Sequence, residues 1–387
     1  MFSSEYFDAG LYRVGTACEK WDVCRAEHGA ETLPMWVADM DFPSPPAVQE
    51  AILRRAAHPT WGYTEVEAAL PEAVSAFWAR RHGTDFAAAE LTLLPCVVTG
   101  LKTAIRAYTR PGEGVLIQSP VYGPFRMAVE ATGRKLLDAP LVPDARGRYH
   151  MDLQAVEEAC RAGAKLMMLC SPHNPVSRLW SREELTALLE ILGRWGVPLV
   201  SDEIHADFEY EPHSFVSVRS LAPERTVTLL APSKTFNLAG LQTAFAVIAD
   251  EWMRARFADA LASGGVVSGN IFGLEAARAA FEHGDAWLDG LLAYLRGNRE
   301  TLARELAAAL PEAVLTPMEA TYLGWMDLRA YGFHEEELLA RCGRAGVMFT
   351  EGTFFGAQGD GFLRINIGCP RRNIAEAVAR LRRAIIG

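Results

Sequence analysis

The sequence predicts an α/β protein in which a large domain with a mostly parallel sheet is joined to a smaller α+β domain. From about residue 90, short apolar segments alternate with segments of helical periodicity, which is typical of a parallel sheet covered by helices. After about residue 284, this alternation gives way to one long helical segment, two short strands and a closing helix. A chain of 387 residues, half of them hydrophobic, is long enough to bury the core of such a protein.

Five apolar segments are the predicted strands of the large sheet: 115–118, 166–170, 197–201, 226–231 and 244–249. Between the second and third of these strands, residues 181–195 predict a helix, because leucines 185, 188, 189 and 192 fall on one helical face. Ser181 and Glu184 have the spacing of a capping box, which marks the start of this helix.

The small domain is predicted from the last part of the chain. It contains a long helix with leucines at 302, 306 and 310, strands over 322–328 and 362–367, and a closing helix with apolar residues at 374, 378, 381 and 385. The predicted division is an N-terminal arm (1–46) that joins the small domain, a large domain (47–283) and a small domain (284–387).

Composition and charge exclude several classes of protein. The net charge is −10 and no stripe of lysine and arginine is present, so nucleic acid is not an expected partner. No apolar run reaches the roughly 18–20 residues of a membrane span, and the N-terminus lacks the pattern of a signal peptide. The seven cysteines are scattered without a Cys-x-x-Cys pair, which favours reduced thiols in the cytoplasm over disulfides or a metal site.

The segment LLAPSKTFNLAGLQ (229–242) places Lys234 directly after a predicted buried strand, although lysine is rarely buried. Asp202 and Asn174 follow two other predicted strands, and ligands of open α/β sheets bind at the carboxyl ends of strands. Each residue also has an ordinary explanation: a solvated lysine, a capping aspartate and an asparagine in a turn before proline. Together, however, they predict a lysine, a carboxylate and an amide that converge on one crevice.

These residue types suit pyridoxal phosphate. This cofactor needs a lysine amine for a Schiff base and a carboxylate that keeps its ring nitrogen protonated, and Lys234 and Asp202 are the candidates. Asn174 can donate to the ring oxygen. The backbone N–H groups near Val97 and Val98, at the start of a predicted helix, can hold the phosphate.

Two further residues extend this hypothesis. The hydroxyl of Ser233, next to the lysine, can add a phosphate contact, and Tyr122, after another predicted strand, can stack on the ring. Taken alone, Tyr122 is better explained as a half-buried aromatic residue at the start of a helix.

The motifs SPHNP, SDEIH, APSKTFNLAGLQ and RINIGCPR resemble those of the fold-type I, aspartate aminotransferase-like pyridoxal-phosphate enzymes. With MWVADMDFPSPP and WGYT, they are similar to the MalY/PatB-type C–S β-lyases, the cystathionine β-lyase branch of class I/II. The resemblance runs from about residue 35 to residue 372 and rests on the order and spacing of the motifs. It implies a seven-stranded, mostly parallel sheet in the large domain and a smaller α+β domain.

The resemblance also implies the roles of the residues that match the motifs. Lys234 binds the cofactor and transfers the Cα proton of the substrate, Asp202 pairs with the ring nitrogen, and Tyr122 is the third catalytic residue. The residues that contact the ring are Asn174, Tyr122 and His205. The residues that bind the phosphate are Val97, Val98 and Ser233.

Substrate contacts and assembly are implied in the same way. Arg364 clamps the α-carboxylate of an amino-acid substrate in a bidentate pair, and Met40 and Asp41 border the substrate. Tyr63, in WGYT, reaches the phosphate in the neighbouring subunit, so the resemblance implies a homodimer.

Two positions depart from the pattern of the family. Many relatives have glycine where this chain has Ser177, and aminotransferases of this fold often have a phosphate-binding arginine where this chain has Gln242. The loss of that cation weakens the predicted phosphate site and fits the lyase branch better than the aspartate aminotransferase branch.

Three functions remain open at this point. The first is a C–S β-lyase that cleaves L-cystathionine or another cysteine S-conjugate into a thiol, pyruvate and ammonia. The second is an aminotransferase of a small or aromatic amino acid, because both reactions begin with removal of the Cα proton by the same residues. The third is a non-catalytic binding or regulatory protein, and Lys234 argues against it.

Overall fold

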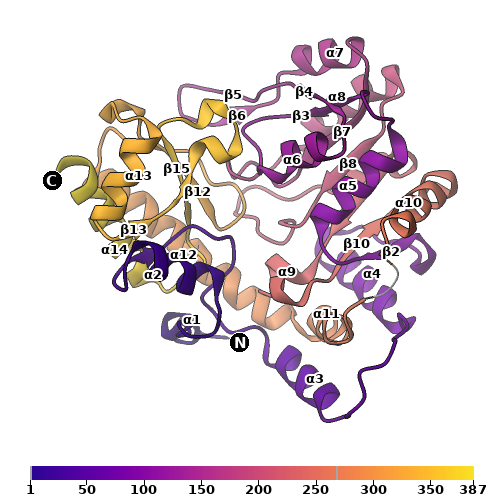
Figure 1. Ribbon diagram of the computed structural model, residues 1–387, viewed down its shortest axis with the longest axis horizontal. Coiled ribbons are helices and arrows are strands. Elements are labelled where there is room, and N and C mark those ends of the chain that lie inside the picture. Colours follow the sequence, from indigo (N-terminus) through magenta and orange to yellow (C-terminus); the bar gives the residue numbers. More distant parts are fainter. Residues whose placement is uncertain (1, 267–268) are drawn as a thin grey trace.

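The computed structural model describes residues 2–266 and 269–387, and a seven-stranded sheet forms the centre of this part of the chain. The strand order is β2-β10-β9-β8-β7-β3-β4 (Figure 1). Only β10 runs antiparallel to its neighbours among these strands. The strands are β2 (Leu91–Leu94), β3 (Gly114–Ile117), β4 (Lys135–Asp138), β7 (Ala164–Cys170), β8 (Leu199–Asp202), β9 (Thr226–Leu230) and β10 (Ala244–Val247). The predicted fold class, with a mostly parallel seven-stranded sheet, is confirmed.

Helices cover both faces of this sheet, which explains why its strands are apolar throughout. Successive residues of a strand point to opposite faces, so Val115 packs with one set of helices and Leu116 with the other. The first set is α5 (Val97–Tyr108), α6 (Pro124–Ala131) and α10 (Glu251–Ser263). The second set is α7 (Leu153–Arg161) and α8 (Arg182–Trp195).

The start of α8 shows how closely the local sequence specifies an element. The Ser181 hydroxyl accepts the Glu184 N–H at 3.2 Å, and the Glu184 carboxylate accepts the Ser181 N–H at 2.8 Å. The predicted capping box is therefore confirmed. Leu185, Leu188 and Leu192 are buried against the sheet.

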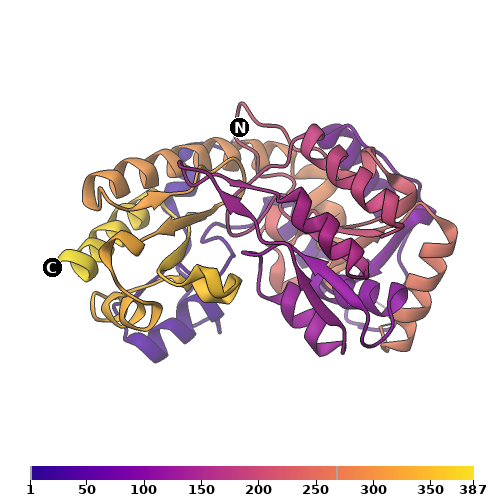
Figure 2. The same cartoon turned by 90° about the horizontal axis from the view of Figure 1, so that it is seen from above.

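A second, four-stranded antiparallel sheet lies in the C-terminal part of the chain, in the order β11-β12-β15-β14. Figure 2 shows the long helix α12, in orange, running along both halves of the molecule. The strands are β11 (Val314–Leu315), β12 (Leu323–Asp327), β14 (Thr350–Glu351) and β15 (Phe362–Asn366), and the helices are α12 (Asp285–Ala309), α13 (Glu335–Arg344) and α14 (Arg371–Ile386).

The N-terminal arm packs with this second half. Its strand β1 (Leu33–Pro34) pairs in parallel with β13 (Val347–Met348), and the Asn366 N–H donates to the Met35 carbonyl at 2.9 Å. The exact division at residues 46/47 and 283/284 stays a prediction. Besides short 3-10 helices, the chain also contains α1 (Ser4–Ala9), the π-helix η1 (Glu19–Val23), α2 (Cys24–His28), α3 (Pro46–Ala56), α4 (Ala69–His82), β5 (Val142–Pro143), β6 (Tyr149–His150), α9 (Pro232–Thr235) and α11 (Ile271–His283).

Residues 2–266 and 269–387 contain neither a membrane-spanning helix nor a cluster of metal ligands. No helix in these ranges is both long and apolar enough to span a bilayer. The same ranges contain no group of three or more histidine, cysteine or acidic side chains with the geometry of a metal site.

Candidate active site

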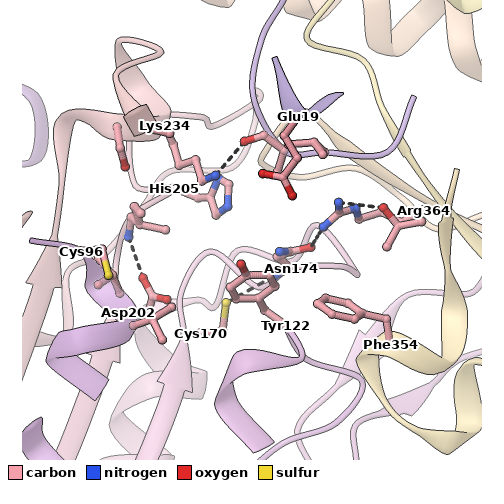
Figure 3. A pocket seen from close by; sticks show the side chains of 18 of the residues that line it. Glu19, Cys96, Tyr122, Cys170, Asn174, Asp202, His205, Lys234, Phe354 and Arg364 are labelled. Atoms are coloured by element: carbon pink, nitrogen blue, oxygen red, sulfur yellow. Dashed lines mark hydrogen bonds between the residues drawn. The ribbon is translucent and has the colours of Figure 1, made fainter. Parts of the chain in front are cut away.

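The carboxyl ends of three neighbouring strands, β7, β8 and β9, open into a cavity of about 410 Å³. Asn174 follows β7, Asp202 is the last residue of β8, and Lys234 lies in the short helix α9 directly after β9. Because these strands are parallel and adjacent, their ends meet at one edge of the sheet. The predicted convergence of lysine, carboxylate and amide is therefore present in the structure (Figure 3).

Lys234 extends from α9 across the cavity to the N-terminal arm. Its Nζ donates to the carbonyl oxygen of Ala38 at 2.7 Å. Burial lowers the pKa of Lys234 to about 8, while the charge of Arg364 lowers it and the charges of Asp39 and Asp202 raise it. A substantial fraction of this amine is therefore neutral near physiological pH, as a nucleophile or a proton acceptor requires.

Asp202 is a buried carboxyl group with few hydrogen-bond or charged partners among the described residues. Its side chain accepts the Ile204 N–H at 3.1 Å, and the residue is only 4% exposed. Burial raises the pKa of Asp202 to about 7, against the lowering effects of the Ile204 N–H and the Lys234 charge. A cationic group placed beside this carboxylate would stabilise its ionised form.

Arg364, in β15, is a buried cation on the opposite side of the cavity. Its guanidinium donates to the Trp36 carbonyl at 2.6 Å, to the Thr350 hydroxyl at 2.9 Å and to Asn174 Oδ1 at 3.3 Å. Within the described residues, Nε has no hydrogen-bond partner and no carboxylate forms an ion pair with Arg364. Burial lowers the pKa of Arg364 to about 10, so the site suits an anionic ligand.

The start of α5 forms another side of the cavity. Val97 and Val98 line it as the first two residues of the helix, and no side chain caps this helix end. Ser233 lines the cavity nearby, before Lys234. An uncapped helix start with free N–H groups binds anions such as phosphate.

Tyr122 and His205 complete the group of predicted residues that line the cavity. The Tyr122 N–H donates to the Asn174 carbonyl at 3.1 Å, and burial raises the pKa of its phenol. Burial holds the pKa of His205 well below its usual range, with smaller contributions from the charges of Lys234 and Arg364. The His205 ring is therefore neutral at physiological pH, and among the described residues its Nδ1 has no partner.

Met40 and Asp41 do not border the cavity, which corrects the prediction made for them. Met40 is fully buried, and the Asp41 carboxylate is engaged by Lys20 at 2.9 Å and by Arg13 at 3.0 Å. The residues of the same motif that line the cavity are two to five positions earlier: Trp36, Val37 and Ala38. The backbone of the motif turns so that Trp36–Ala38 face the cavity.

Tyr63 is fully exposed and lies outside this cavity in the single chain. The neighbouring Trp61 is also exposed and packs against Phe272, with ring centroids 5.4 Å apart. The contact of Tyr63 with a second subunit stays a prediction.

Several lining residues were not predicted from the sequence. Glu19 comes from η1 in the N-terminal arm, and Cys96 precedes α5. Thr350, Glu351 and Phe354 line the cavity from the C-terminal half. For Cys96, its place directly before the predicted phosphate-binding residues was an available signal, whereas nothing in the sequence near Glu19 indicates a site.

The two departures from the family pattern have a shared backbone feature. Ser177 has φ +51° and Gln242 has φ +47°, and both values lie in the left-handed region that favours glycine. Ser177 is held there by its hydroxyl, which bonds to Thr321 Oγ1 at 2.9 Å and donates to the Leu323 carbonyl. Gln242 lines the cavity.

This fold and cavity place the protein in a known class. A family model described as aminotransferase class I and II matches residues 33–381, and the chain belongs to this family. Cystathionine beta-lyase PatB of Bacillus subtilis (strain 168) is 39% identical over 385 residues, which cover 98% of this chain and 99% of that protein. Protein MalY of Escherichia coli (strain K12) is 32% identical over 384 residues, or 98% of each chain.

A solved structure agrees with these relatives. Cystalysin from Treponema denticola, which contains a pyridoxal 5'-phosphate cofactor, is similar with a TM-score of 0.95 and 31% identity over 99% of both chains. The resemblance to the MalY/PatB branch that the motifs predicted is therefore confirmed.

Proposed function

We propose that this protein is a pyridoxal-phosphate-dependent C–S β-lyase that cleaves L-cystathionine or a related cysteine S-conjugate. The observation that carries the proposal is the similarity, over nearly the whole chain, to a protein named cystathionine beta-lyase. A C–S lyase of Staphylococcus hominis, 30% identical with a TM-score of 0.91, was solved with pyridoxal phosphate bound.

The cavity fits this cofactor. A protonated ring nitrogen beside Asp202 supplies the cation that this buried carboxylate lacks as a hydrogen-bond partner. The uncapped start of α5 offers N–H groups to the phosphate, and Lys234 supplies an amine of lowered pKa. Asn174, Tyr122 and His205 are the residues proposed to contact the ring, and Ser233 is proposed to contact the phosphate.

The residues of the chain position the substrate and move its proton. Pyridoxal phosphate, when bound, supplies an electron sink for the negative charge that develops at the substrate Cα. The Arg364 guanidinium binds the α-carboxylate and thereby orients Cα toward Lys234. The neutral Lys234 amine accepts the Cα proton, and the resulting ammonium is a proton donor for the departing sulfur.

The proposal is tested by counting turnovers with L-cystathionine as the sole substrate. A β-lyase releases homocysteine, pyruvate and ammonia over many turnovers without any added 2-oxo acid. An aminotransferase stops near one turnover per site and resumes when 2-oxoglutarate or pyruvate is added. A stop of this kind would contradict the lyase proposal and favour the aminotransferase.

The proposal includes a homodimer in which Tyr63 contacts the phosphate bound to the partner. The exposed pair of Tyr63 and Trp61 supports it, because large aromatic residues are enriched at protein interfaces. Light scattering at the assay concentration should give twice the monomer mass. A fully active monomer would contradict the proposed assembly.

A cytoplasmic location also stays a prediction. It rests on the seven cysteines, each of which is free in the structure.

A further inference from the structure

Two carboxylates of the cavity have no use in the mechanism above. Glu19 enters from η1 and Glu351 from β14. Within residues 2–266 and 269–387, no hydrogen bond or ion pair is formed by either carboxylate. Glu351 lies close enough to Arg364 for its charge to raise the pKa of that guanidinium, so a cation already offsets part of its charge. Among residues 2–266 and 269–387, no lysine, arginine or histidine forms an ion pair with Glu19.

The position of Glu19 is fixed by its neighbours in the sequence. The next residue, Lys20, is completely buried and forms an ion pair with Asp41 at 2.9 Å. The Trp36 indole N–H donates to the Lys20 carbonyl at 3.0 Å, and the Asp22 carboxylate accepts two backbone N–H groups at 2.8 and 2.9 Å. These contacts anchor η1, so Glu19 is held at the cavity although its own side chain is exposed.

The orientation of the substrate brings its leaving group to the side of the cavity formed by Glu19 and the N-terminal arm. Arg364, with its buried and partnerless Nε, marks the position of the α-carboxylate, and Lys234 marks the position of Cα. Val97 and Asp202 lie at the end of the cavity that fits the cofactor. The substituent on sulfur therefore extends along the arm, and Figure 3 draws Glu19 between Lys234 and Arg364 on that side.

We propose that Glu19 determines specificity by binding an ammonium group on the leaving-thiol half of the substrate. The enzyme then prefers cysteine S-conjugates whose sulfur substituent is cationic over those whose substituent is neutral or anionic. This inference rests on the proposed β-lyase function. In the reaction, the Cβ–S bond breaks, its electron pair leaves with sulfur, and a proton converts the thiolate to a thiol. The remainder takes up one water molecule to give pyruvate and ammonia.

The test compares three substrates that differ at the end of the sulfur substituent. S-(3-aminopropyl)-L-cysteine carries an ammonium group, S-butyl-L-cysteine replaces that group by a methyl group, and S-(2-carboxyethyl)-L-cysteine carries a carboxylate. Pyruvate release by the purified holoenzyme gives kcat/KM for each. The wild-type enzyme should prefer the aminopropyl substrate to the butyl substrate, and the carboxyethyl substrate should be the poorest.

The decisive measurement is the ratio of kcat/KM for the aminopropyl and butyl substrates. Glu19→Gln should lower this ratio by about five- to 20-fold, because it removes one partly solvated ion pair. Glu19→Asp should restore part of the ratio. The matched control is Glu27→Gln, an exposed carboxylate of α2 outside the cavity, which should leave the ratio unchanged.

Two outcomes would overturn the inference. One is a wild-type enzyme that cleaves the three substrates equally well, and the other is a Glu19→Gln variant that keeps the wild-type ratio. Failure of the wild-type enzyme to release pyruvate from L-cystathionine is a different result, because it overturns the proposed function itself.

Discussion

Polar groups are buried differently on two walls of the cavity. The sheet-edge wall consists of the start of α5 and the residues after β7, β8 and β9, including Asp202 and Lys234. The cover wall consists of the arm residues Glu19 and Trp36–Ala38 together with Thr350 and Arg364 from the C-terminal half. Burial shifts the pKa of Asp202 up to about 7 and that of Lys234 down to about 8.

On the cover wall, Arg364 is tied to the backbone and to neighbouring polar side chains, whereas within the described residues the Glu19 carboxylate forms no hydrogen bond or ion pair. Arg364 donates to a carbonyl, a hydroxyl and an amide, and the buried Lys20 behind this wall is paired with Asp41. The two walls therefore differ in how far their polar groups depend on a bound ligand. On the sheet-edge wall the Asp202 carboxyl has one backbone partner and a bound cation can complete it, whereas Arg364 on the cover wall already donates three hydrogen bonds before a ligand binds.

The largest effect is expected at the sheet-edge wall. Lys234→Ala removes the amine that accepts the Cα proton, so turnover of L-cystathionine should fall by about 10³-fold or more. Pyruvate release measures it, and circular dichroism checks the fold. Lys165→Ala, at the opposite end of β7, is the matched control and should retain wild-type turnover. A Lys234→Ala enzyme with wild-type activity would remove the lysine from the mechanism.

At the cover wall, Arg364→Ala should lower kcat/KM for L-cystathionine by about 30- to 4,000-fold, the equivalent of about 2–5 kcal/mol for a desolvated charge pair. Bound cofactor should be retained, because Arg364 lies on the wall opposite Asp202. Arg344→Ala, an exposed arginine of α13, serves as the control. Loss of the cofactor together with activity would contradict the separation of the two walls.

Asp202→Asn should stabilise the cofactor-free protein, since it removes a buried charge. Above pH 7 the carboxyl is ionised in both the folded and unfolded states. Burial of this charge then destabilises the folded state to its full extent, on the order of 2–4 kcal/mol. Below pH 7 the folded state retains the proton, and the stabilisation should be about 2 kcal/mol smaller at pH 5.5 than at pH 8.

Urea unfolding of the cofactor-free protein at pH 5.5 and at pH 8 measures this difference. Asp259→Asn, at an exposed position in α10, is the control and should show no comparable dependence on pH. An Asp202→Asn variant that is less stable than the wild type at pH 8 would show that the carboxylate is already compensated.

The smallest effect is expected at Ser177, whose hydroxyl bonds to Thr321 and to the first residue of β12. Ser177→Gly relieves the strain of a positive φ, worth about 1 kcal/mol, and loses hydrogen bonds of similar value. The free energy of unfolding should change by less than about 1 kcal/mol. Ser177→Ala keeps the strain and loses the bonds, so it should be destabilised by about 1–2 kcal/mol. Equal stability of the two variants would contradict this explanation.

The two walls also differ in how well the sequence predicted them. The sheet-edge wall follows from strand ends, which apolar segments mark clearly: the predicted strand 226–231 is β9, Thr226–Leu230, and Lys234 follows it. The antiparallel direction of β10 was not predictable, because an apolar strand reads the same in either direction. Because the strand sequences do not give strand directions, the predicted topology of the sheet came from the family resemblance.

The cover wall was predicted only in part. Arg364 was identified through the motif RINIGCPR, but Met40 and Asp41 were assigned to the cavity and Glu19 was missed. The arm has no regular periodicity at these positions, and its path depends on ion pairs such as Arg13 with Asp39, 26 residues apart. Local sequence patterns carry no information about such contacts.

The cover wall joins the first and last parts of the chain. The Thr350 hydroxyl donates to the Trp36 carbonyl across 314 residues. During synthesis, Lys234 is added 130 residues before Arg364, an interval of roughly 7–26 seconds at common elongation rates. Lys234 therefore leaves the ribosome well before the C-terminal part of the cover wall, Thr350 and Arg364, and after the arm residues of that wall. Until Thr350 and Arg364 are made, the cover wall lacks its C-terminal part, so a cofactor aldehyde can approach Lys234 before the pocket is complete.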